Sequence, residues 1–166
     1  MNALADFNTV FQDEVPNYHS SGSSTSSLHM RLPRIRVQDN RSEWAKKLED
    51  RFDELTSLPK GWDGYDGVPV SFTCAQFAAN LVERLYVKGV GVPQLVPGAD
   101  GTLQLEWHMN QYNLEIDVLA PYEVVATLYD HLTEQEQEIE VQTDFTELSE
   151  WVISLSQDRQ PVQMEA

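Results

Sequence analysis

The feature that most constrains the fold is a change of hydrophobic period near Pro93. Before it, apolar residues recur every three or four positions, as in amphipathic helices, and after it they alternate with polar residues, as in half-buried strands. One more helical pattern follows near the end of the chain. This order predicts an α+β two-layer sandwich, with two N-terminal helices, an antiparallel meander sheet of about four to five strands and a C-terminal helix.

Three segments have the spacing of a helix that buries one face. The first should begin near Ser42, a suitable N-cap, and the second should run from Ser71 to about Lys88. The third should open at Asp144, which has the capping-box spacing to Glu147. The expected buried faces are Trp44, Leu48, Phe52 and Leu55; Cys74, Ala78, Leu81, Val82 and Leu85; and Phe145, Leu148, Val152 and Leu155.

Alternating patterns separated by turn signals predict the strands of the meander. The segment Val96–Gly101 carries an Asp-Gly turn signal, and the chain should reverse again at Asn110-Gln111 or in a slightly longer loop. An acidic loop, Thr133–Gln137, should precede the last strand. The expected strands are Leu103–Met109, Leu114–Val118, Tyr122–Tyr129 and Glu138–Thr143.

Composition divides the chain into three parts. Residues 1–40 include the low-complexity run Ser20–Ser27 and are expected to form a flexible Ser-rich tail, residues 41–157 a single α+β domain, and residues 158–166 a C-terminal tail. Within the first part, Leu28–Val37 alternates apolar and basic residues. This pattern suits a strand added to a sheet edge, in this molecule or in a partner, and equally a lead-in strand of the domain.

Charge is distributed unevenly along the chain, which has a net charge of −16. Residues 31–60 hold eight of the eleven basic side chains against six acidic ones, whereas the chain from Asp100 onward holds fifteen acidic side chains and one basic, Arg159. An acidic surface repels nucleic acid and anionic lipid and attracts basic proteins. We therefore expect a basic protein partner and no direct nucleic-acid binding by the acidic half, although the charge would also serve solubility alone.

Other signals concern compartment and cofactors. No apolar run approaches the roughly 20 residues of a membrane span, and Met1–Glu14 does not resemble a signal peptide. The single cysteine, Cys74, excludes an internal disulfide and is expected to be an inert core thiol. His19, His29 and His131 have no metal-ligand spacing. We expect a cytoplasmic protein with no membrane contact, metal or cofactor.

Two motifs carry a resemblance to a known family. Gly61-Trp62-Asp63-Gly64-Tyr65 is followed by a helix and then by Gln104-Leu105-Glu106-Trp107. Over roughly residues 42–130 the chain resembles an uncharacterised bacterial family with a Gly-Trp-Asp-Gly-Tyr-Gly-Ala loop and a Gln-Leu-Glu-Trp strand. It departs from that pattern at Asp66-Gly67, where a backbone turn should differ. The family has no known activity, so the resemblance implies the architecture and no mechanism.

The glycine-rich loop is the first candidate site. Trp62 and Tyr65 are large rings in a loop that glycines make adaptable, and with Asp63 they are expected to form a partner-binding loop. The alternative is structural: Trp62 fills the gap between the helices and the sheet, and Asp63 accepts hydrogen bonds from loop amides.

The polar face of the expected hairpin is the second candidate site. A two-residue turn places Glu106 opposite Glu115 and Gln104 opposite Asp117, whereas a four-residue loop places His108 opposite Glu115. Like charges facing each other in a sheet are unfavourable, so a basic partner, a metal ion or water should compensate them. The partner-binding residues expected on this surface and in the acidic loop are Glu106, His108, Glu115, Asp117, Glu134 and Glu136.

Three functions are compatible with these patterns. The first is a non-enzymatic acidic protein that neutralises or escorts a basic macromolecular partner, as an antitoxin, an immunity protein or an accessory subunit does. The second is a phage or mobile-element inhibitor whose carboxylates replace nucleic-acid phosphates. The third is a metal-dependent enzyme that uses the hairpin carboxylates, although the motifs of the common enzyme classes are absent from the sequence.

Overall fold

The computed structural model describes Ile35 and residues 43–157 of the chain, all of which belong to one compact unit, Pro33–Ala166. The expected tails, 1–40 and 158–166, therefore lie outside the described residues apart from Ile35. The same holds for the Ser42 cap and for the rest of Leu28–Val37. Ile35 itself is buried in the hydrophobic core.

Three helices form one layer of the fold. They are α1 (Glu43–Thr56), α2 (Phe72–Leu85) and α3 (Thr146–Leu155). The Ser71 side chain caps α2 by accepting a hydrogen bond from the backbone amide of Cys74. Cys74 is buried, as predicted. None of the described helices is long and apolar enough to cross a membrane.

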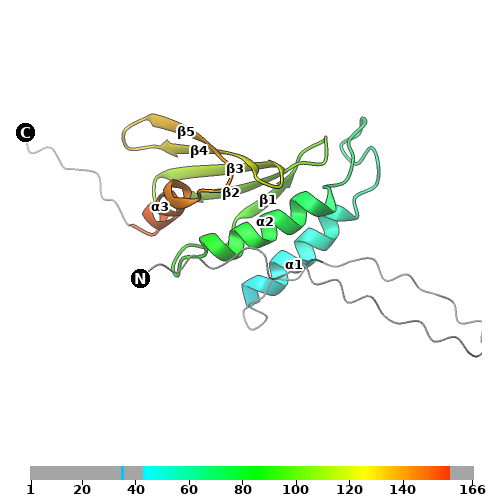
Figure 1. Ribbon diagram of the computed structural model, residues 1–166, viewed down its shortest axis with the longest axis horizontal. Coiled ribbons are helices and arrows are strands. Elements are labelled where there is room, and N and C mark those ends of the chain that lie inside the picture. The colour runs from blue at the N-terminus through cyan, green and yellow to red at the C-terminus, as the bar shows by residue number, and fades with distance from the viewer. Residues whose placement is uncertain (1–34, 36–42, 158–166) are drawn as a thin grey trace, which may run out of the picture. The chain divides into compact units, whose positions relative to one another are not determined.

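Five antiparallel strands form the other layer, in the order in which they occur in the chain. Figure 1 shows the three helices on one side of this sheet. The predicted α+β architecture is confirmed. The strands are β1 (Gln94–Pro97), β2 (Leu103–Met109), β3 (Tyr112–Ala120), β4 (Glu123–Asp130) and β5 (Gln135–Val141).

The core lies between the helices and the inner face of the sheet. Alternate residues of β2, β3 and β4 are buried there against Phe52 of α1 and Leu148 of α3, both of which are fully buried. Because side chains on a strand alternate between the faces, these apolar contacts leave the other residues of each strand on the opposite face. No buried polar or charged residue interrupts the core within the described part of the chain.

Several predicted boundaries are wrong by a few residues. Strand β3 is longer than predicted at both ends, β5 ends at Val141 and not at Thr143, and Val96 and Pro97, predicted to lie in a turn, belong to β1. Helix α2 ends at Leu85 and not at Lys88, because Tyr86 leaves the helical region with ψ of 126°. Strand β5 begins at Gln135, three residues before the predicted start, since the chain reverses within residues 131–134. Asp144 accepts hydrogen bonds from the amide and hydroxyl of Thr146, so it precedes α3 in a local turn in place of the expected capping box.

The β2–β3 turn fixes the register of the sheet. Asn110 and Gln111 both have positive φ, 50° and 69°, which is the geometry of a two-residue type I′ hairpin. This turn confirms the shorter of the two predicted connections. The side-chain amide of Asn110 also donates to the backbone carbonyl oxygen of Leu155 at 2.7 Å, which ties the turn to the end of α3.

Replacing Gln111 with glycine should stabilise the protein, because a left-handed conformation is strained for glutamine and unstrained for glycine. We expect Gln111→Gly to raise the free energy of unfolding by about 0.5–1 kcal/mol in urea titrations. Gln111→Ala is the matched control and should bring no gain, since alanine keeps the strain. A Gln111→Gly variant less stable than the wild type would contradict the assigned turn.

Candidate partner-binding face of the sheet

The open face is the side of the sheet that carries none of the described helices, and the paired rows of β2 to β5 gather six carboxylates there. The strand pairing arranges its residues in three rows across the sheet. No Lys or Arg occurs anywhere between Gln94 and Gln157, so no basic side chain from this part of the chain neutralises them. The rows are Gln104, Asp117, Val125 and Glu140; Glu106, Glu115, Thr127 and Glu138; and His108, Asn113, Tyr129 and Glu136.

Glu106 and Glu115 face each other across β2 and β3, as the two-residue turn predicts. Each of these two carboxylates has one polar side chain of the hairpin beside it. The Gln104 amide lies 3.4 Å from Glu115 Oε2, and His108 Nε2 lies 3.4 Å from Glu106 Oε2. Both contacts are long for hydrogen bonds, so the compensation of the two charges is partial. The hairpin holds two facing carboxylates that an external cation would stabilise.

His108 is placed to hold a proton. Its Nδ1 lies 3.0 Å from the side-chain oxygen of Asn113, and its Nε2 faces Glu106, so both ring nitrogens meet acceptors. The hydrogen bond with Asn113 is the main cause that raises the pKa of His108, and the hydrogen bond and charge of Glu106 and the charge of Glu115 add to it. Half of the side chain is exposed, which leaves the ring accessible to a partner.

The folded protein disfavours the ionised form of Asp117, a carboxylate of the open face. Partial burial raises its pKa above the ordinary value, the negative charge of Glu106 raises it further, and a hydrogen bond from Gln104 acts in the other direction. The ionised form of Asp117 is therefore less favourable in the folded protein than in the unfolded chain.

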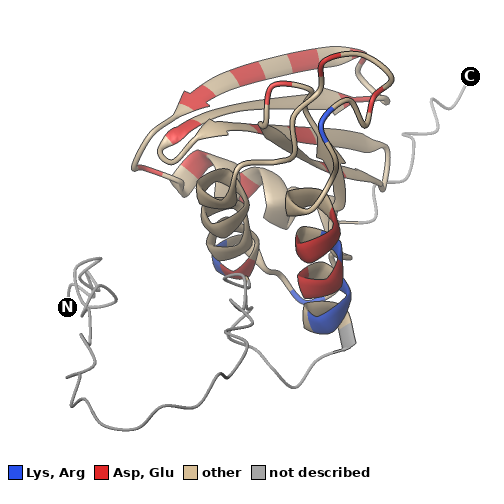
Figure 2. Cartoon of the chain, turned by 90° about the vertical axis from the view of Figure 1, so that its right-hand side faces the viewer, with Lys and Arg blue, Asp and Glu red and all other residues tan. Residues whose placement is uncertain are grey.

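Strand β5 adds a line of three glutamates to the open face. Glu136, predicted to lie in an acidic loop, belongs to the strand together with Glu138 and Glu140, and all three alternate with residues on the helix side. Figure 2 shows their acidic bands along β5. Glu134 does lie in the β4–β5 turn, with φ of 54°. Glu138 and Glu140 are missing from the predicted site, although their alternation with Gln137 and Ile139 could have revealed them.

The glycine-rich loop between α1 and α2 divides its predicted residues between two roles. The indole of Trp62 donates to the carbonyl oxygen of Val68, and Asp63 Oδ1 accepts from the amides of Tyr65 and Gly67 at 2.9 and 3.0 Å. These hydrogen bonds, the one from Tyr65 first, lower the pKa of Asp63. Trp62 and Asp63 thus hold the loop together. Tyr65 is 87% exposed at its tip.

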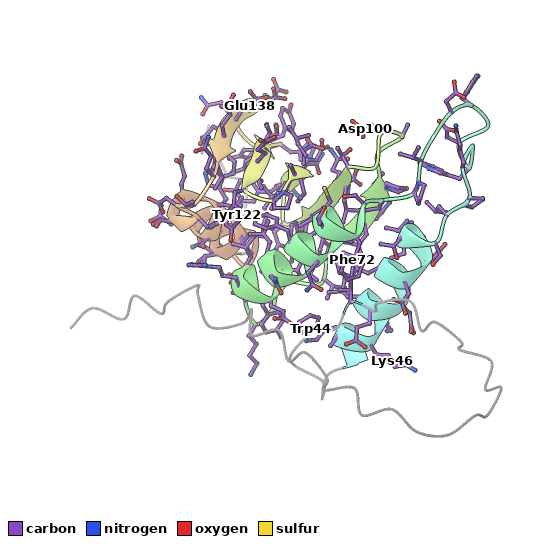
Figure 3. The ribbon with its side chains drawn as sticks, turned by 45° about the vertical axis from the view of Figure 1, so that its right-hand side comes forward. Trp44, Lys46, Phe72, Asp100, Tyr122 and Glu138 are labelled. Atoms are coloured by element: carbon purple, nitrogen blue, oxygen red, sulfur yellow. The ribbon has the colours of Figure 1, made fainter. Side chains whose placement is uncertain are left out.

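The same loop is fixed to the sheet through the β1–β2 turn. The amide of Val68 donates to Ala99, and the amide of Ser71 donates to Gly101. In Figure 3 the loop lies beside this turn, which is marked by Asp100. Trp62 does not fill the space between helices and sheet as the structural alternative predicted, since it is only partly buried and its indole contact stays within the loop.

The open face does not assemble a metal site. Within the described ranges, no group of three or more His, Cys, Asp and Glu side chains is arranged to hold a metal ion. The carboxylates lie side by side on neighbouring strands and do not converge on one point, since the strands of a sheet are about 4.8 Å apart. Their arrangement is that of an extended charged surface.

Comparison with protein-family models, with curated proteins and with solved structures gave no match for this chain.

The raised pKa of His108 can be tested directly. We expect Asn113→Ala to lower it, because the main acceptor of the protonated ring is removed, and Glu106→Gln to lower it less. A raised folded-state pKa means that His108 adds stability at low pH and loses this contribution as the pH rises through that pKa. An NMR titration of the imidazole measures the shift, and an identical pKa in the wild type and Asn113→Ala would contradict the geometry.

Asp117→Asn should stabilise the free protein at neutral pH. The ionised carboxylate opposes folding, and an asparagine of the same shape removes its charge. The gain in the urea midpoint should shrink as the pH falls through the carboxyl range, where Asp117 itself becomes neutral. Glu123→Gln, at the exposed start of β4, is the control and should change the midpoint little. A loss of stability in Asp117→Asn at neutral pH would refute this account.

Proposed function

We propose that this protein is a non-enzymatic acidic binding protein that neutralises or escorts a basic macromolecular partner, in the manner of an antitoxin, an immunity protein or an accessory subunit. The observation that carries the proposal is the open face: six carboxylates on neighbouring strands, in a stretch of chain without Lys or Arg. We also propose the cytoplasm as its compartment, in keeping with the single cysteine.

Electrostatics supports a protein partner with a basic surface. Aligned carboxylates create a negative potential that accelerates encounter with a cationic surface and repels nucleic acid. The facing pair Glu106 and Glu115 would gain most from such a partner, because within the hairpin they have only the long contacts to His108 and Gln104. Charge that costs stability in the free protein is then offset in the complex.

Tyr65 is a second residue through which the protein would contact its partner. The loop that carries it is braced by backbone and side-chain hydrogen bonds, so little conformational freedom is lost when the ring is buried in a partner. A tyrosine on a preorganised loop is a frequent hot spot of protein interfaces. We include Tyr65 in the proposed binding surface and assign Trp62 and Asp63 the role of positioning it.

The inhibitor that mimics nucleic-acid charge is a second candidate, favoured by one observation. Glu136, Glu138 and Glu140 form a single line along one face of β5, with a spacing of about 7 Å between successive residues of the line. A regular line of negative charge is what a nucleic-acid-binding protein recognises. This candidate predicts that double-stranded DNA competes with the protein for its partner, whereas a partner that binds no nucleic acid excludes it.

The proposal is tested by affinity capture of a partner from the native host with the full chain as bait. We expect one stoichiometric basic protein that is retained at about 0.05 M salt and released at about 0.5 M salt. A bait with Glu106→Gln and Glu115→Gln should retain much less of it. The matched control carries Glu147→Gln and Glu150→Gln in α3 and the same change in net charge.

Three outcomes would overturn the proposal. They are the absence of a stoichiometric partner at either salt concentration, a partner without basic character, and a partner retained equally by both double variants. Circular dichroism of the three baits establishes beforehand that they are equally folded.

A further inference from the structure

The two edges of the sheet differ in how well they are covered. Strand β1 is four residues long, ends at Pro97, and has the carbonyl oxygen of Leu95 hydrogen-bonded to Arg51 of α1 at 3.2 Å. Strand β5 is seven residues long, contains no proline, and has β4 as its one strand neighbour among the described residues. Within the described ranges no backbone group bonds to the outer side of β5, which leaves its donors and acceptors there for pairing.

The first half of β5 is exposed on both faces. Residues 135–138 are all exposed, and only Ile139 and Val141 are packed against the core. An added strand would therefore meet no helix or loop of the described chain beside Gln135–Glu138. Its side chains would alternate between the line Glu136, Glu138 and Glu140 on the open face and Gln135, Gln137 and Ile139 on the other.

The glutamates of β5 select against a second copy of this chain. Pairing of β5 with β5 about a two-fold axis, within one continuous sheet, would place the glutamate lines of both copies on the same face and opposite one another. Like charges in that position are destabilising, whereas a strand with Lys or Arg at every second residue would form opposite-charge cross-strand pairs. The outer edge of β5 therefore disfavours pairing with β5 of a second copy and favours pairing with a basic strand.

We infer that the outer edge of β5 accepts an extended basic segment of the protein partner as a sixth strand. The segment carries Lys or Arg at alternate positions, facing Glu136, Glu138 and Glu140, with small or polar residues between them. Backbone hydrogen bonds supply affinity and the alternating charges supply selectivity, as in other complexes formed by strand addition. This inference rests on the proposed function and adds the partner's conformation and its mode of binding.

Charged residues on an edge strand also protect proteins against unwanted pairing. If the glutamates only protect the edge, binding of a basic peptide depends on charge alone. If the edge accepts an added strand, binding depends on backbone hydrogen bonds as well. The probe is a nine-residue peptide, blocked at both ends, in which Arg alternates with Thr. Two further versions carry N-methyl groups on all Arg amides or on all Thr amides, so that their charges are identical.

Successive amides of a strand point to opposite edges, so only one of the two methylated sets faces β5. We expect the unmodified peptide to bind the full chain at low salt. One methylated version should bind about tenfold more weakly than the other, because it loses the hydrogen bonds to β5. Equal weakening in both versions, or none in either, would overturn strand addition and leave the proposed function standing.

Protein variants locate the site. A triple variant with Glu136, Glu138 and Glu140 changed to Gln should lose most of the affinity for the peptide, and a control in the helices with Asp50 changed to Asn and Glu147 and Glu150 changed to Gln should lose little. NMR shift changes should centre on β5. Changes centred on Glu106 and Glu115 would overturn the inference while supporting the proposed function, and failure of all three peptides to bind would count against both.

Hydrogen exchange of the free full chain shows whether the outer edge of β5 is already paired with another segment of the chain. The β5 amides that do not bond to β4 should exchange rapidly. Slow exchange of those amides would mean that another part of the chain already covers the edge, which would overturn the inference.

Discussion

The type I′ turn at Asn110 and Gln111 is the constraint on which the charged surface depends. Side chains on a strand have a period of two, so a shift of one residue in this hairpin would exchange the faces of β2 and β3. The turn prevents that shift, and the hydrogen bond from Asn110 to Leu155 couples it to α3. Apolar residues therefore meet the helices, and the carboxylates of both strands are held on the open face.

That surface opposes stability within the free protein. Glu106 faces Glu115, and Asp117 is less favourable when ionised than in the unfolded chain. Among the described residues, the contacts that ease the facing pair are the long ones to Gln104 and His108. A surface selected for solubility alone would not need its acids paired on adjacent strands, where repulsion is greatest. A cationic partner turns the same arrangement into a source of binding energy, which connects the local repulsion to the proposed function.

The sequence was sufficient for the architecture, and it left the register of the β2–β3 hairpin open between two loop lengths. The change of period near Pro93 predicted the layers, whereas the positive φ of Asn110 and Gln111 in the structure decides that Glu106 faces Glu115. Sequence reasoning failed where the geometry of a turn sets the end of a strand. Residues 131–134 form a four-residue reversal with Glu134 at positive φ, a conformation that glutamate rarely adopts, and β5 therefore begins before its predicted start.

The loop of Trp62 and Tyr65 shows a second limit of sequence patterns. Two aromatic rings three residues apart have similar chemistry, and nothing in their spacing distinguishes them. The structure separates them through one hydrogen bond, from the indole of Trp62 to Val68, which closes the loop and leaves Tyr65 exposed. Such contacts depend on where the loop meets the β1–β2 turn, a tertiary arrangement without a local signature.

Carbodiimide labelling of carboxylates in the purified complex, compared with the free protein, tests the central claim most directly. The account predicts that the partner protects Glu106, Glu115, Asp117 and the three glutamates of β5, while Glu147 and Glu150 of α3 label equally in both states. Protection confined to Glu147 and Glu150, with the open face labelled as in the free protein, would contradict it.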